Sequence, residues 1–308
     1  MRILISDKLQ EEAIYLLQNN GFEVVKNYTI NHEELQNEIG NYDAIIIRSR
    51  TKLTSHVLEN ANKIKVIGRA GVGLDNIDIS KAEELGIKVL NTPEAPSVSV
   101  AELTIGLILS LVRHIAKADQ TMHCGKWCKS DYFGYTIENK RIGLIGYGNI
   151  GQAVAERCLA LKMEVGIYDV DQTAKEKAKK LGLKVYPSVD ELIMNSQIIS
   201  LHIPATVYTE NTINEKRLKL MSKEAILINT ARGNLVDETA LIKSLKNKEI
   251  GGAALDVYRE EPLKNLDFCD CEDNLILTPH IGSQTKEAQI QASTMIAQKV
   301  SDYLNNIS

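Results

Sequence analysis

The chain of 308 residues has little of what marks the specialised classes of protein. Its 6 prolines leave no proline-rich linker, and its apolar helical stretch at Leu103–Val112 is far shorter than the roughly 20 residues that cross a bilayer. The net charge of −4 provides no excess of positive charge for general binding to nucleic acid or to an anionic membrane. What remains, with 44% hydrophobic residues, is the composition of an ordinary globular protein long enough for two domains.

Cysteine is also scarce, and its count of five is odd. Cys124 and Cys128 lie four positions apart, and Cys269 and Cys271 lie two apart, so a metal or redox site is one interpretation. Neither pair has the spacing of a zinc site, and we expect ordinary thiols in a cytoplasmic protein without a metal. Charged residues from Asp7 onward follow a short N-terminal strand, which argues against a secretory signal peptide.

A glycine-rich turn in the middle of the chain is the most informative motif. Ile142–Ile145 is an apolar run of strand length, and Gln152–Leu161 has helical periodicity. Between them stand Gly146, Gly148 and Gly151, in the order G-x-G-x-x-G. A strand, this turn and a helix form the fingerprint of a dinucleotide-binding domain, in which the pyrophosphate lies at the positive end of the helix.

An acidic residue follows the next expected strand. Val165–Tyr168 ends in Asp169, at about the chain distance expected for the carboxylate that hydrogen-bonds a ribose 2′-hydroxyl. A carboxylate there repels a 2′-phosphate, so we expect NAD rather than NADP as the cofactor. The alternative is a glycine turn in another doubly wound protein, such as one that binds S-adenosylmethionine.

Two series of alternating strands and helices divide the chain, a pattern that predicts parallel sheets covered on both faces. The strands expected in the first series are Ile3–Ile5, Glu23–Val25, Ala44–Ile47, Lys65–Ile67 and Lys88–Leu90. The six expected in the second series are Ile142–Ile145, Val165–Tyr168, Ile198–His202, Ala225–Ile228, Gly252–Leu255 and Leu275–Leu277. We therefore predict an α/β protein with two doubly wound parallel-sheet domains, the second of Rossmann type.

Two helices raise questions of packing. Val98–Ala116 is apolar on nearly all sides, so a subunit interface is expected to cover the face that its own domain leaves open, and we predict a homodimer. The alternative is complete burial within the monomer. The last helix, Thr285–Leu304, has a single apolar stripe and is expected to pack on a domain surface, for which the first domain is the candidate.

Three residues have the chemistry that hydride transfer to a nicotinamide requires: a general base, a group that orients it, and a cation for the substrate carboxylate. His280 in TPHIG and Arg232 in NTARG each follow an expected strand, at the edge where doubly wound sheets bind ligands. Glu261 in DVYREEP would fix the tautomer of the His280 imidazole. Taken singly, each has another explanation: a structural histidine, an arginine that caps a turn, and Glu260 in place of Glu261.

The motifs GYGNIG, ILINTARGNLVDE, DVYREEP and LTPHIGSQTKEAQ together resemble, in order, those of the D-isomer-specific 2-hydroxyacid dehydrogenase family. The resemblance implies His280 as acid and base, Glu261 as its partner and Arg232 as the carboxylate binder. It implies further cofactor contacts at Asn149, Ile150, Asp169, Pro204, Thr209, Ala231 and Asp256, the last facing the nicotinamide amide.

The family also implies a domain organisation. Residues 1–95 and 283–308 would form a discontinuous, flavodoxin-like substrate-binding domain, because the terminal helix of such proteins returns to the first domain. Residues 96–282 would form the NAD-binding domain. Hydride transfer is expected in a cleft between the two that closes on binding.

The first domain carries the clue to the substrate. IIIRSRTKLT and KVIGRAGVGLDNIDI resemble segments of the phosphoglycerate dehydrogenases of this family. Arg48 and Arg69 follow neighbouring expected strands, with Arg50 and Lys52 nearby, and these cations predict a phosphate on the substrate besides its carboxylate. The expected carboxylate contacts are the backbone N–H groups of Gly71, Val72 and Gly73, and Lys129 is a further candidate for the phosphate. The alternative is that these cations are solvated or paired.

The sequence therefore predicts an NAD-dependent oxidation of 3-phospho-D-glycerate to 3-phosphohydroxypyruvate, the entry to serine synthesis. The alternatives are a glyoxylate or hydroxypyruvate reductase, a D-lactate dehydrogenase and, in a different class, an NAD-sensing transcriptional corepressor. Longer relatives carry a C-terminal serine-binding regulatory domain. The chain ends at Ser308, and we expect no serine feedback through such a module.

Overall fold

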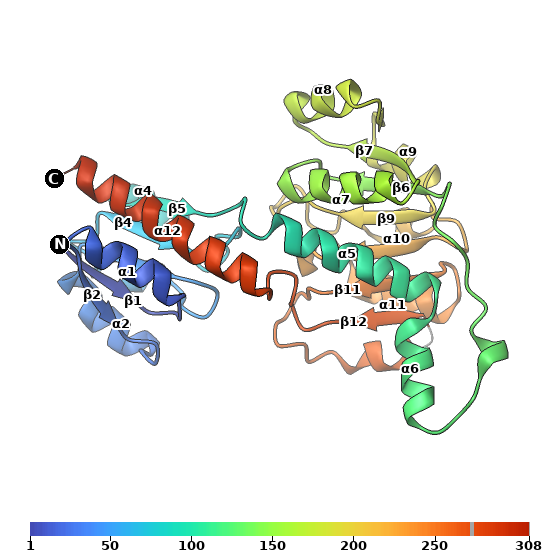
Figure 1. The fold of residues 1–308 in the computed structure, drawn as a ribbon, viewed down its shortest axis with the longest axis horizontal. Coiled ribbons are helices and arrows are strands. Elements are labelled where there is room, and N and C mark those ends of the chain that lie inside the picture. Colours follow the sequence, from blue (N-terminus) through green and yellow to red (C-terminus); the bar gives the residue numbers. More distant parts are fainter. Residues whose placement is uncertain (272–273, 308) are drawn as a thin grey trace. The chain divides into compact units, whose positions relative to one another are not determined.

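The computed structural model describes residues 1–271 and 274–307 and divides into two compact units. The first comprises Met1–Ser97 and Ser283–Ser308, and the second Val98–Gly282 (Figure 1). The chain thus leaves the first unit two residues after the boundary expected at position 95. Each unit is built on one parallel β-sheet, which confirms the predicted fold class.

The first unit has a five-stranded sheet in the order β2-β1-β3-β4-β5, which is the flavodoxin-like order. Its strands are β1 (Arg2–Ile5), β2 (Glu23–Lys26), β3 (Ala44–Ile47), β4 (Val66–Arg69) and β5 (Lys88–Asn91). Its helices are α1 (Glu11–Asn19), α2 (His32–Glu38), α3 (Ser55–Leu58), α4 (Ile79–Glu84) and α12 (Lys286–Asn306), with a 3₁₀ turn at Ile39–Asn41.

Alternation along the strands builds two apolar layers in this unit. Ile3 and Ile5 point toward α1 and α12, whereas Leu4 points toward α2, α3 and α4. Helix α12 lies beside α1 (Figure 1) and packs tightly on β4, where a Cβ added to Gly68 would lie 2.7 Å from Val300 Cγ2. The glycine in the middle of β4 therefore lets the C-terminal helix approach the sheet.

The second unit has a seven-stranded sheet in the order β12-β11-β10-β9-β6-β7-β8. Its strands are β6 (Arg141–Ile145), β7 (Glu164–Tyr168), β8 (Lys184–Val185), β9 (Ile198–Leu201), β10 (Ile226–Asn229), β11 (Gly252–Leu255) and β12 (Leu275–Leu277). The order reverses between β6 and β9, as in dinucleotide-binding sheets. We predicted six of these strands. The seventh, β8, has two residues, too few to produce a periodic pattern.

Helices cover both faces of the second sheet. Apolar side chains of α5 (Ser97–Val112), α7 (Asn149–Ala160) and α8 (Gln172–Lys180) form one layer. Those of α9 (Val189–Met194), α10 (Glu215–Leu218) and α11 (Glu238–Lys246) form the other. The remaining elements are α6 (Ile115–His123) and three 3₁₀ segments, Lys129–Asp131, Gly233–Leu235 and Leu266–Cys271.

The helix predicted over Val98–Ala116 was too long. It ends at Val112, because His114 has a left-handed backbone conformation (φ 54°) that breaks the helix, and α6 begins at Ile115. No single helix in the described part of the chain is long and apolar enough to cross a membrane; α5 and α6 together have the length and composition, but they meet at 67°.

The cysteines described are free thiols. Cys158 is buried, which raises the pKa of its thiol to about 12, and Cys271 is buried as well. Cys124 is exposed and Cys128 is half-buried. The side chain of Cys269 lies outside the described residues. Within residues 1–271 and 274–307, no group of three or more His, Cys, Asp and Glu side chains is placed to hold a metal ion.

Candidate active site

The glycine turn joins β6 to α7, and its three glycines have different surroundings. Gly146 has φ of 100°, and a Cβ on it would lie 2.4 Å from the carbonyl oxygen of His202. A Cβ on Gly151 would lie 2.3 Å from the carbonyl oxygen of Gly146. Gly148, at the N-cap of α7, is exposed and has nothing within 4 Å of where a Cβ would stand. Two glycines thus allow the turn to pack closely, and the third leaves room in front of the helix N-terminus for a pyrophosphate.

Asp169 lies at the end of β7, beside this turn. Its Oδ2 accepts a hydrogen bond of 2.6 Å from the Tyr147 N–H, and its Oδ1 accepts one of 2.9 Å from the Asp171 N–H. A pocket of about 380 Å³ opens here, lined by Tyr147, Gly148, Gln152, Asp169, Asp171, Thr173, Ala174 and Lys177. The pocket has the place and the carboxylate expected for the adenosine ribose. Asn149 and Ile150 form the first turn of α7 next to it.

His202 lies at the end of β9, under the glycine turn. Its Nε2 is 2.9 Å from Ser200 Oγ, and its buried Nδ1 has no hydrogen-bond partner among the residues described. Burial lowers the pKa of His202 to about 3, so the imidazole is neutral at physiological pH. The histidine therefore supports the turn without placing a positive charge beneath it.

The segment after β9 carries Pro204 and Thr209. Thr209 Oγ1 donates to the Pro204 carbonyl oxygen at 2.7 Å and accepts from the Thr206 N–H at 2.8 Å. The side chain of Thr209, a predicted cofactor contact, thus also closes its own loop. Pro204 in the same loop is exposed. Ala231, after β10, donates its N–H to Asn229 Oδ1 at 3.1 Å.

His280 and Glu261 are in direct contact. His280 Nδ1 lies 2.7 Å from Glu261 Oε2, and Glu261 Oε1 accepts a hydrogen bond of 3.1 Å from the Tyr258 N–H. An ionised carboxylate only accepts, so Nδ1 carries the proton and Nε2 remains as the basic nitrogen. Glu260 instead pairs with Lys264, which identifies Glu261 as the partner of the histidine.

Asp256 organises the loop that bears His280. It is fully buried after β11. Its Oδ1 accepts from Thr278 Oγ1 at 2.6 Å and from the Ile281 N–H at 2.8 Å, and its Oδ2 accepts from the Gly282 N–H at 2.8 Å. His280 itself has φ of 51°, a left-handed conformation that is rare for residues other than glycine. Three hydrogen bonds to one carboxylate hold the loop in this shape. A contact of Asp256 with a nicotinamide amide stays a prediction.

Arg232 extends from the end of β10. Its backbone is extended, the Asn229 side-chain amide donates to its carbonyl oxygen at 2.9 Å, and its own Nη1 donates to the Ala231 carbonyl oxygen at 2.7 Å. The arginine is half-buried. It follows β10, and β10 pairs with β11, the strand before Asp256 and Glu261, so these residues lie on one edge of the second sheet.

The first unit brings Arg48 and Arg69 to neighbouring strand ends. Ile47 of β3 pairs with Arg69 of β4, and Arg48 is the next residue. Burial lowers the pKa of Arg48, while the negative charge of Asp7 opposes that shift. The Arg69 side chain lies over Gly71, where a Cβ would come within 1.5 Å of Arg69 Nη1.

The expectation for Gly71 needs correction. Its N–H donates to Thr92 Oγ1 at 2.7 Å and is therefore not free for a substrate carboxylate. The N–H groups of Val72 and Gly73 have no acceptor among the residues described, and their binding of a substrate carboxylate stays a prediction. The side chain of Lys129, in the 3₁₀ turn after α6, is exposed, and the second unit rather than the first carries it.

A comparison with known families shows which family the chain belongs to. Residues 105–282 match the NAD-binding domain of the D-isomer-specific 2-hydroxyacid dehydrogenases. The chain belongs to this family.

Relatives of this chain carry the names of enzymes with different substrates. It is 43% identical to a D-3-phosphoglycerate dehydrogenase of Methanocaldococcus jannaschii, over 99% of this chain and 57% of that protein. It is 40% identical to a hydroxypyruvate reductase of Thermotoga maritima, over 97% of each chain. The chain thus spans little more than half the length of some curated relatives.

Solved structures show the same fold. The TT0316 protein of Thermus thermophilus superimposes with a TM-score of 0.89 at 31% identity, covering 99% of this chain and 97% of that one. An acyclic imino acid reductase in complex with NADPH and D-Arg has a TM-score of 0.89 at 33% identity, covering 99% and 98%.

Sequence reasoning missed some of the residues that hold this candidate site together. Arg259 donates from its backbone N–H to Glu238 Oε1 at 2.8 Å, while its guanidinium contacts Asn211 and donates to the Val236 carbonyl oxygen at 3.2 Å. It therefore ties the Glu261 segment to the segments after β9 and β10. Nothing in the motif DVYREEP distinguishes this arginine from a solvated one, because its partners are distant in the sequence.

Proposed function

We propose that this protein is an NAD-dependent dehydrogenase that oxidises 3-phospho-D-glycerate to 3-phosphohydroxypyruvate and so supplies serine synthesis. The observation that carries the substrate is Arg48, a half-buried arginine that directly follows β3. Among the residues described, the Arg48 guanidinium makes no hydrogen bond or ion pair. An unpaired, partly desolvated guanidinium is a natural site for a phosphate. Several curated relatives are D-3-phosphoglycerate dehydrogenases.

The chemistry would be carried by His280, Glu261 and Arg232. The basic Nε2 of His280 removes the C2 hydroxyl proton in oxidation and returns it in reduction, while Glu261 holds the ring through Nδ1. Arg232 orients the substrate through its carboxylate. When bound, NAD supplies the hydride acceptor, and the open space at Gly148, the N-terminus of α7 and the Asp169 carboxylate fit a dinucleotide.

Asp169 also supports a preference for NAD over NADP. The pocket beside it contains a second carboxylate, Asp171, and both would repel a 2′-phosphate, whereas only Lys177 among the lining residues would attract one. The family nevertheless has a relative solved with NADPH. Comparing kcat/KM for NADH and NADPH tests this, with NADH expected to be favoured.

The substrate is tested by initial rates of NADH oxidation with 3-phosphohydroxypyruvate, hydroxypyruvate, glyoxylate and pyruvate at matched concentrations. If two charge-assisted contacts reach the phosphate, kcat/KM for the phosphorylated acid should exceed that for hydroxypyruvate by roughly two orders of magnitude. A flat profile, or a preference for an unphosphorylated acid, would contradict the proposed substrate and leave the dehydrogenase.

A second candidate is a hydroxypyruvate reductase. The Thermotoga maritima relative with that name matches over 97% of both chains, so its likeness, unlike that of the longer phosphoglycerate dehydrogenases, extends over nearly the whole relative. This candidate predicts that hydroxypyruvate is the best substrate in the same assay and that replacing Arg48 leaves its turnover unchanged.

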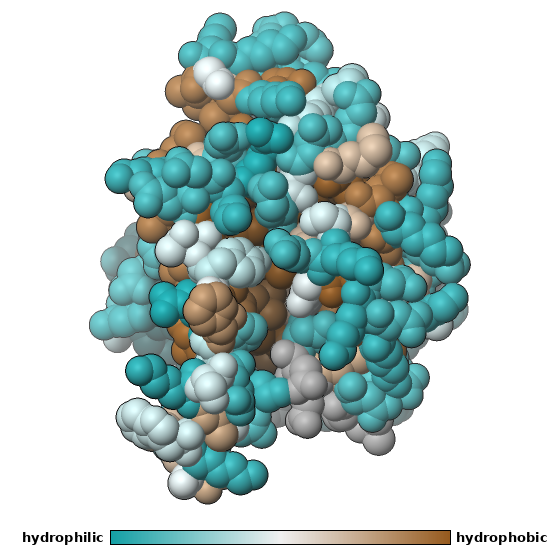
Figure 2. Space-filling view, turned by 90° about the vertical axis from the view of Figure 1, so that its right-hand side faces the viewer, coloured by the Kyte–Doolittle hydropathy of each residue, from teal (hydrophilic) through white to brown (hydrophobic). Residues whose placement is uncertain are grey.

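The second unit supports the proposal of a homodimer. Its exposed large apolar side chains include Ile115, Met122, Trp127 and Phe133, the last 94% exposed. A groove of about 450 Å³ lies at the start of β10 and β12, bounded by α5, α6 and Phe133. Figure 2 shows hydrophobic side chains exposed within a largely hydrophilic face. A second copy of the chain would cover this surface.

Light scattering after size exclusion tests the dimer and should give twice the chain mass. Phe133→Ser should shift the measured mass toward that of the monomer. A monomeric wild type would contradict the dimer.

A further inference from the structure

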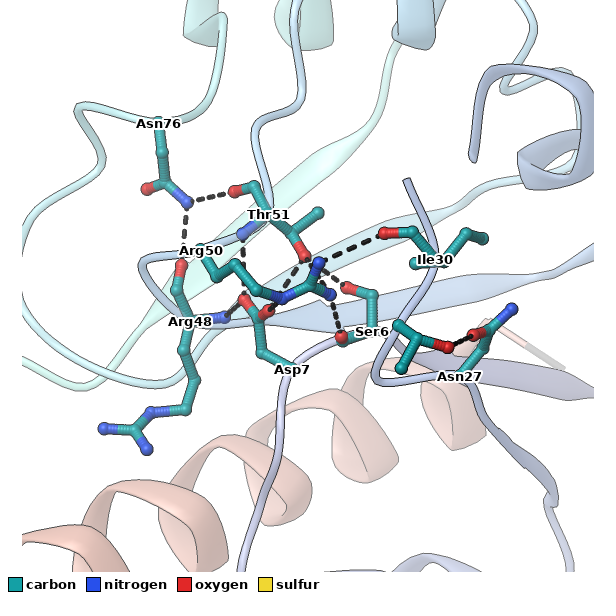
Figure 3. A network of polar contacts seen from close by, with 9 residues as sticks. Ser6, Asp7, Asn27, Ile30, Arg48, Arg50, Thr51 and Asn76 are labelled. Atoms are coloured by element: carbon teal, nitrogen blue, oxygen red, sulfur yellow. Dashed lines mark hydrogen bonds and ion pairs between the residues drawn. The ribbon is translucent and has the colours of Figure 1, made fainter. Parts of the chain in front are cut away.

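The loop after β3, residues 48–51 and called here the Arg48 loop, is held from below by one buried carboxylate (Figure 3). Asp7 is 4% exposed. Its Oδ2 accepts from the Arg48 N–H at 2.6 Å and from the Thr51 N–H at 3.2 Å. Its Oδ1 accepts from Thr51 Oγ1 at 2.9 Å and from Arg50 Nε at 2.9 Å. A single carboxylate thus fixes both ends of the loop.

A second side chain closes the loop from the other side. The Asn76 amide donates to the carbonyl oxygen of Arg48 at 2.7 Å and to that of Thr51 at 2.6 Å. Residues 48 and 51 are therefore held at N–H and C=O alike. We call Asp7 and Asn76 the clamp of the Arg48 loop.

The clamp treats the two arginines of the loop differently. The Arg50 guanidinium lies within the network, where it donates hydrogen bonds to Asp7 and to the carbonyl oxygens of Ile30 and Ser6. The Arg48 side chain points away from the network in Figure 3, and no hydrogen bond to its guanidinium is found among the described residues. Arg50 neutralises the buried carboxylate, and Arg48 is left to meet an external anion.

We propose that Asp7 and Asn76 are positioning residues that preorganise Arg48 for the phosphate of the substrate. The inference rests on the proposed function. A long side chain on a flexible loop loses both backbone and rotamer entropy when it binds an anion. In a loop that is already fixed at both ends, the backbone entropy has been lost on folding, so binding costs less. The clamp therefore raises affinity for a phosphorylated substrate without contacting it.

The test is a double-mutant cycle with two substrates. Asp7→Asn and Asn76→Ala are made alone and in an Arg48→Ala background, and kcat/KM is measured for 3-phosphohydroxypyruvate and hydroxypyruvate. Each clamp variant should lower kcat/KM for the phosphorylated acid roughly three- to tenfold and leave hydroxypyruvate within about twofold. In the Arg48→Ala background neither should lower it further beyond about twofold. Asn60→Ala is the matched control, because the exposed Asn60 amide also donates to a carbonyl oxygen in this unit.

The outcomes separate the clamp from the proposed function. If Arg48→Ala affects both substrates equally, the phosphate assignment fails. If Arg48→Ala is selective but the clamp variants lower both substrates equally, or add their losses to that of Arg48→Ala, the clamp proposal fails alone. Should Asp7→Asn not fold, Asn76→Ala decides, since it removes two hydrogen bonds and leaves no buried charge unpaired.

Discussion

Two loops, one in each unit, are built on the same plan. In the first unit Asp7 follows β1 and holds the loop after the neighbouring strand β3, which presents Arg48. In the second unit Asp256 follows β11 and holds the loop after the neighbouring strand β12, which presents His280. Each buried carboxylate accepts backbone N–H groups from the adjacent loop. Each loop presents one side chain, Arg48 or His280, to which we assign a role in the proposed function.

The two loops differ in how the buried charge is compensated. Asp7 has an ion pair with Arg50 as well as its N–H donors. Asp256 is fully buried, and its donors among the described residues are one hydroxyl and two N–H groups of its loop. A carboxylate satisfied by neutral donors depends on every one of them, because a lost donor leaves a buried charge short of a partner. The His280 loop should therefore tolerate change less well than the Arg48 loop.

The largest effect is expected at the residue that the second loop presents. His280→Gln keeps a polar side chain but removes the basic Nε2, so kcat should fall by roughly 10²- to 10⁴-fold with every substrate. Initial rates with the phosphorylated and unphosphorylated acids measure this. His123→Gln, at an exposed position on α6, is the control and should retain wild-type rates. A His280→Gln enzyme with rates near the wild type would remove His280 from the chemistry.

The next effect concerns the carboxylate beneath that loop. Asp256→Asn turns one acceptor oxygen into a donor facing hydroxyl and N–H donors, and should lower the free energy of unfolding by about 1–3 kcal/mol. Displacement of His280 should reduce kcat by roughly 10- to 100-fold. Thr278→Val removes one donor and keeps the carboxylate, and its losses should be smaller. Chemical denaturation and initial rates measure both, and a harmless Asp256→Asn would break the comparison with Asp7.

These paired loops also show where sequence reasoning ends. The succession of strands along the chain was predictable from apolar runs of strand length. The places of Arg48, Arg232 and His280 were predictable too, because each of these residues follows such a run. The roles of Asp7 and Asn76 were not. Each acts on residues at least 25 positions away in the sequence, and neither spacing nor periodicity encodes such a contact.

The same limit explains the errors in the prediction. The end of α5 at Val112 depends on the left-handed conformation of His114, a residue type that gives no warning of it. The loss of the Gly71 N–H to Thr92 depends on how two loops meet. The predicted contact of His280 with Glu261 is not one of these errors, because His280 Nδ1 does contact Glu261 and Glu260 pairs with Lys264.

A smaller effect concerns the imidazole of His202, which, unlike the carboxylates of Asp7 and Asp256, is buried in the neutral form and is expected to make stability depend on pH. In the unfolded chain this group takes up a proton near pH 6.5, and in the folded protein only near pH 3. Between these values the imidazole of His202 binds a proton in the unfolded state but not in the folded state. Its contribution to the free energy of unfolding is therefore fully present above about pH 6.5 and is lost as the pH drops toward 3. Each unit of pH in that window removes up to about 1.4 kcal/mol.

His202→Gln should weaken that pH dependence, because Gln keeps a polar group near Ser200 and does not titrate. Thermal unfolding from pH 7 to pH 4 measures the difference in slope between the variant and the wild type. His32→Gln, at an exposed position in the first unit, serves as the control. Identical slopes for His202→Gln and the wild type would show that His202 is not held neutral by burial.

The central claim is that the two loops divide the work, with substrate selection at Arg48 and proton transfer at His280. It is tested most directly by the ratio of kcat/KM for 3-phosphohydroxypyruvate to that for hydroxypyruvate, in the wild type, Arg48→Ala and His280→Gln. The account predicts that Arg48→Ala lowers this ratio at least about tenfold, while His280→Gln lowers both rates and leaves the ratio near that of the wild type. An unchanged ratio in Arg48→Ala would contradict it.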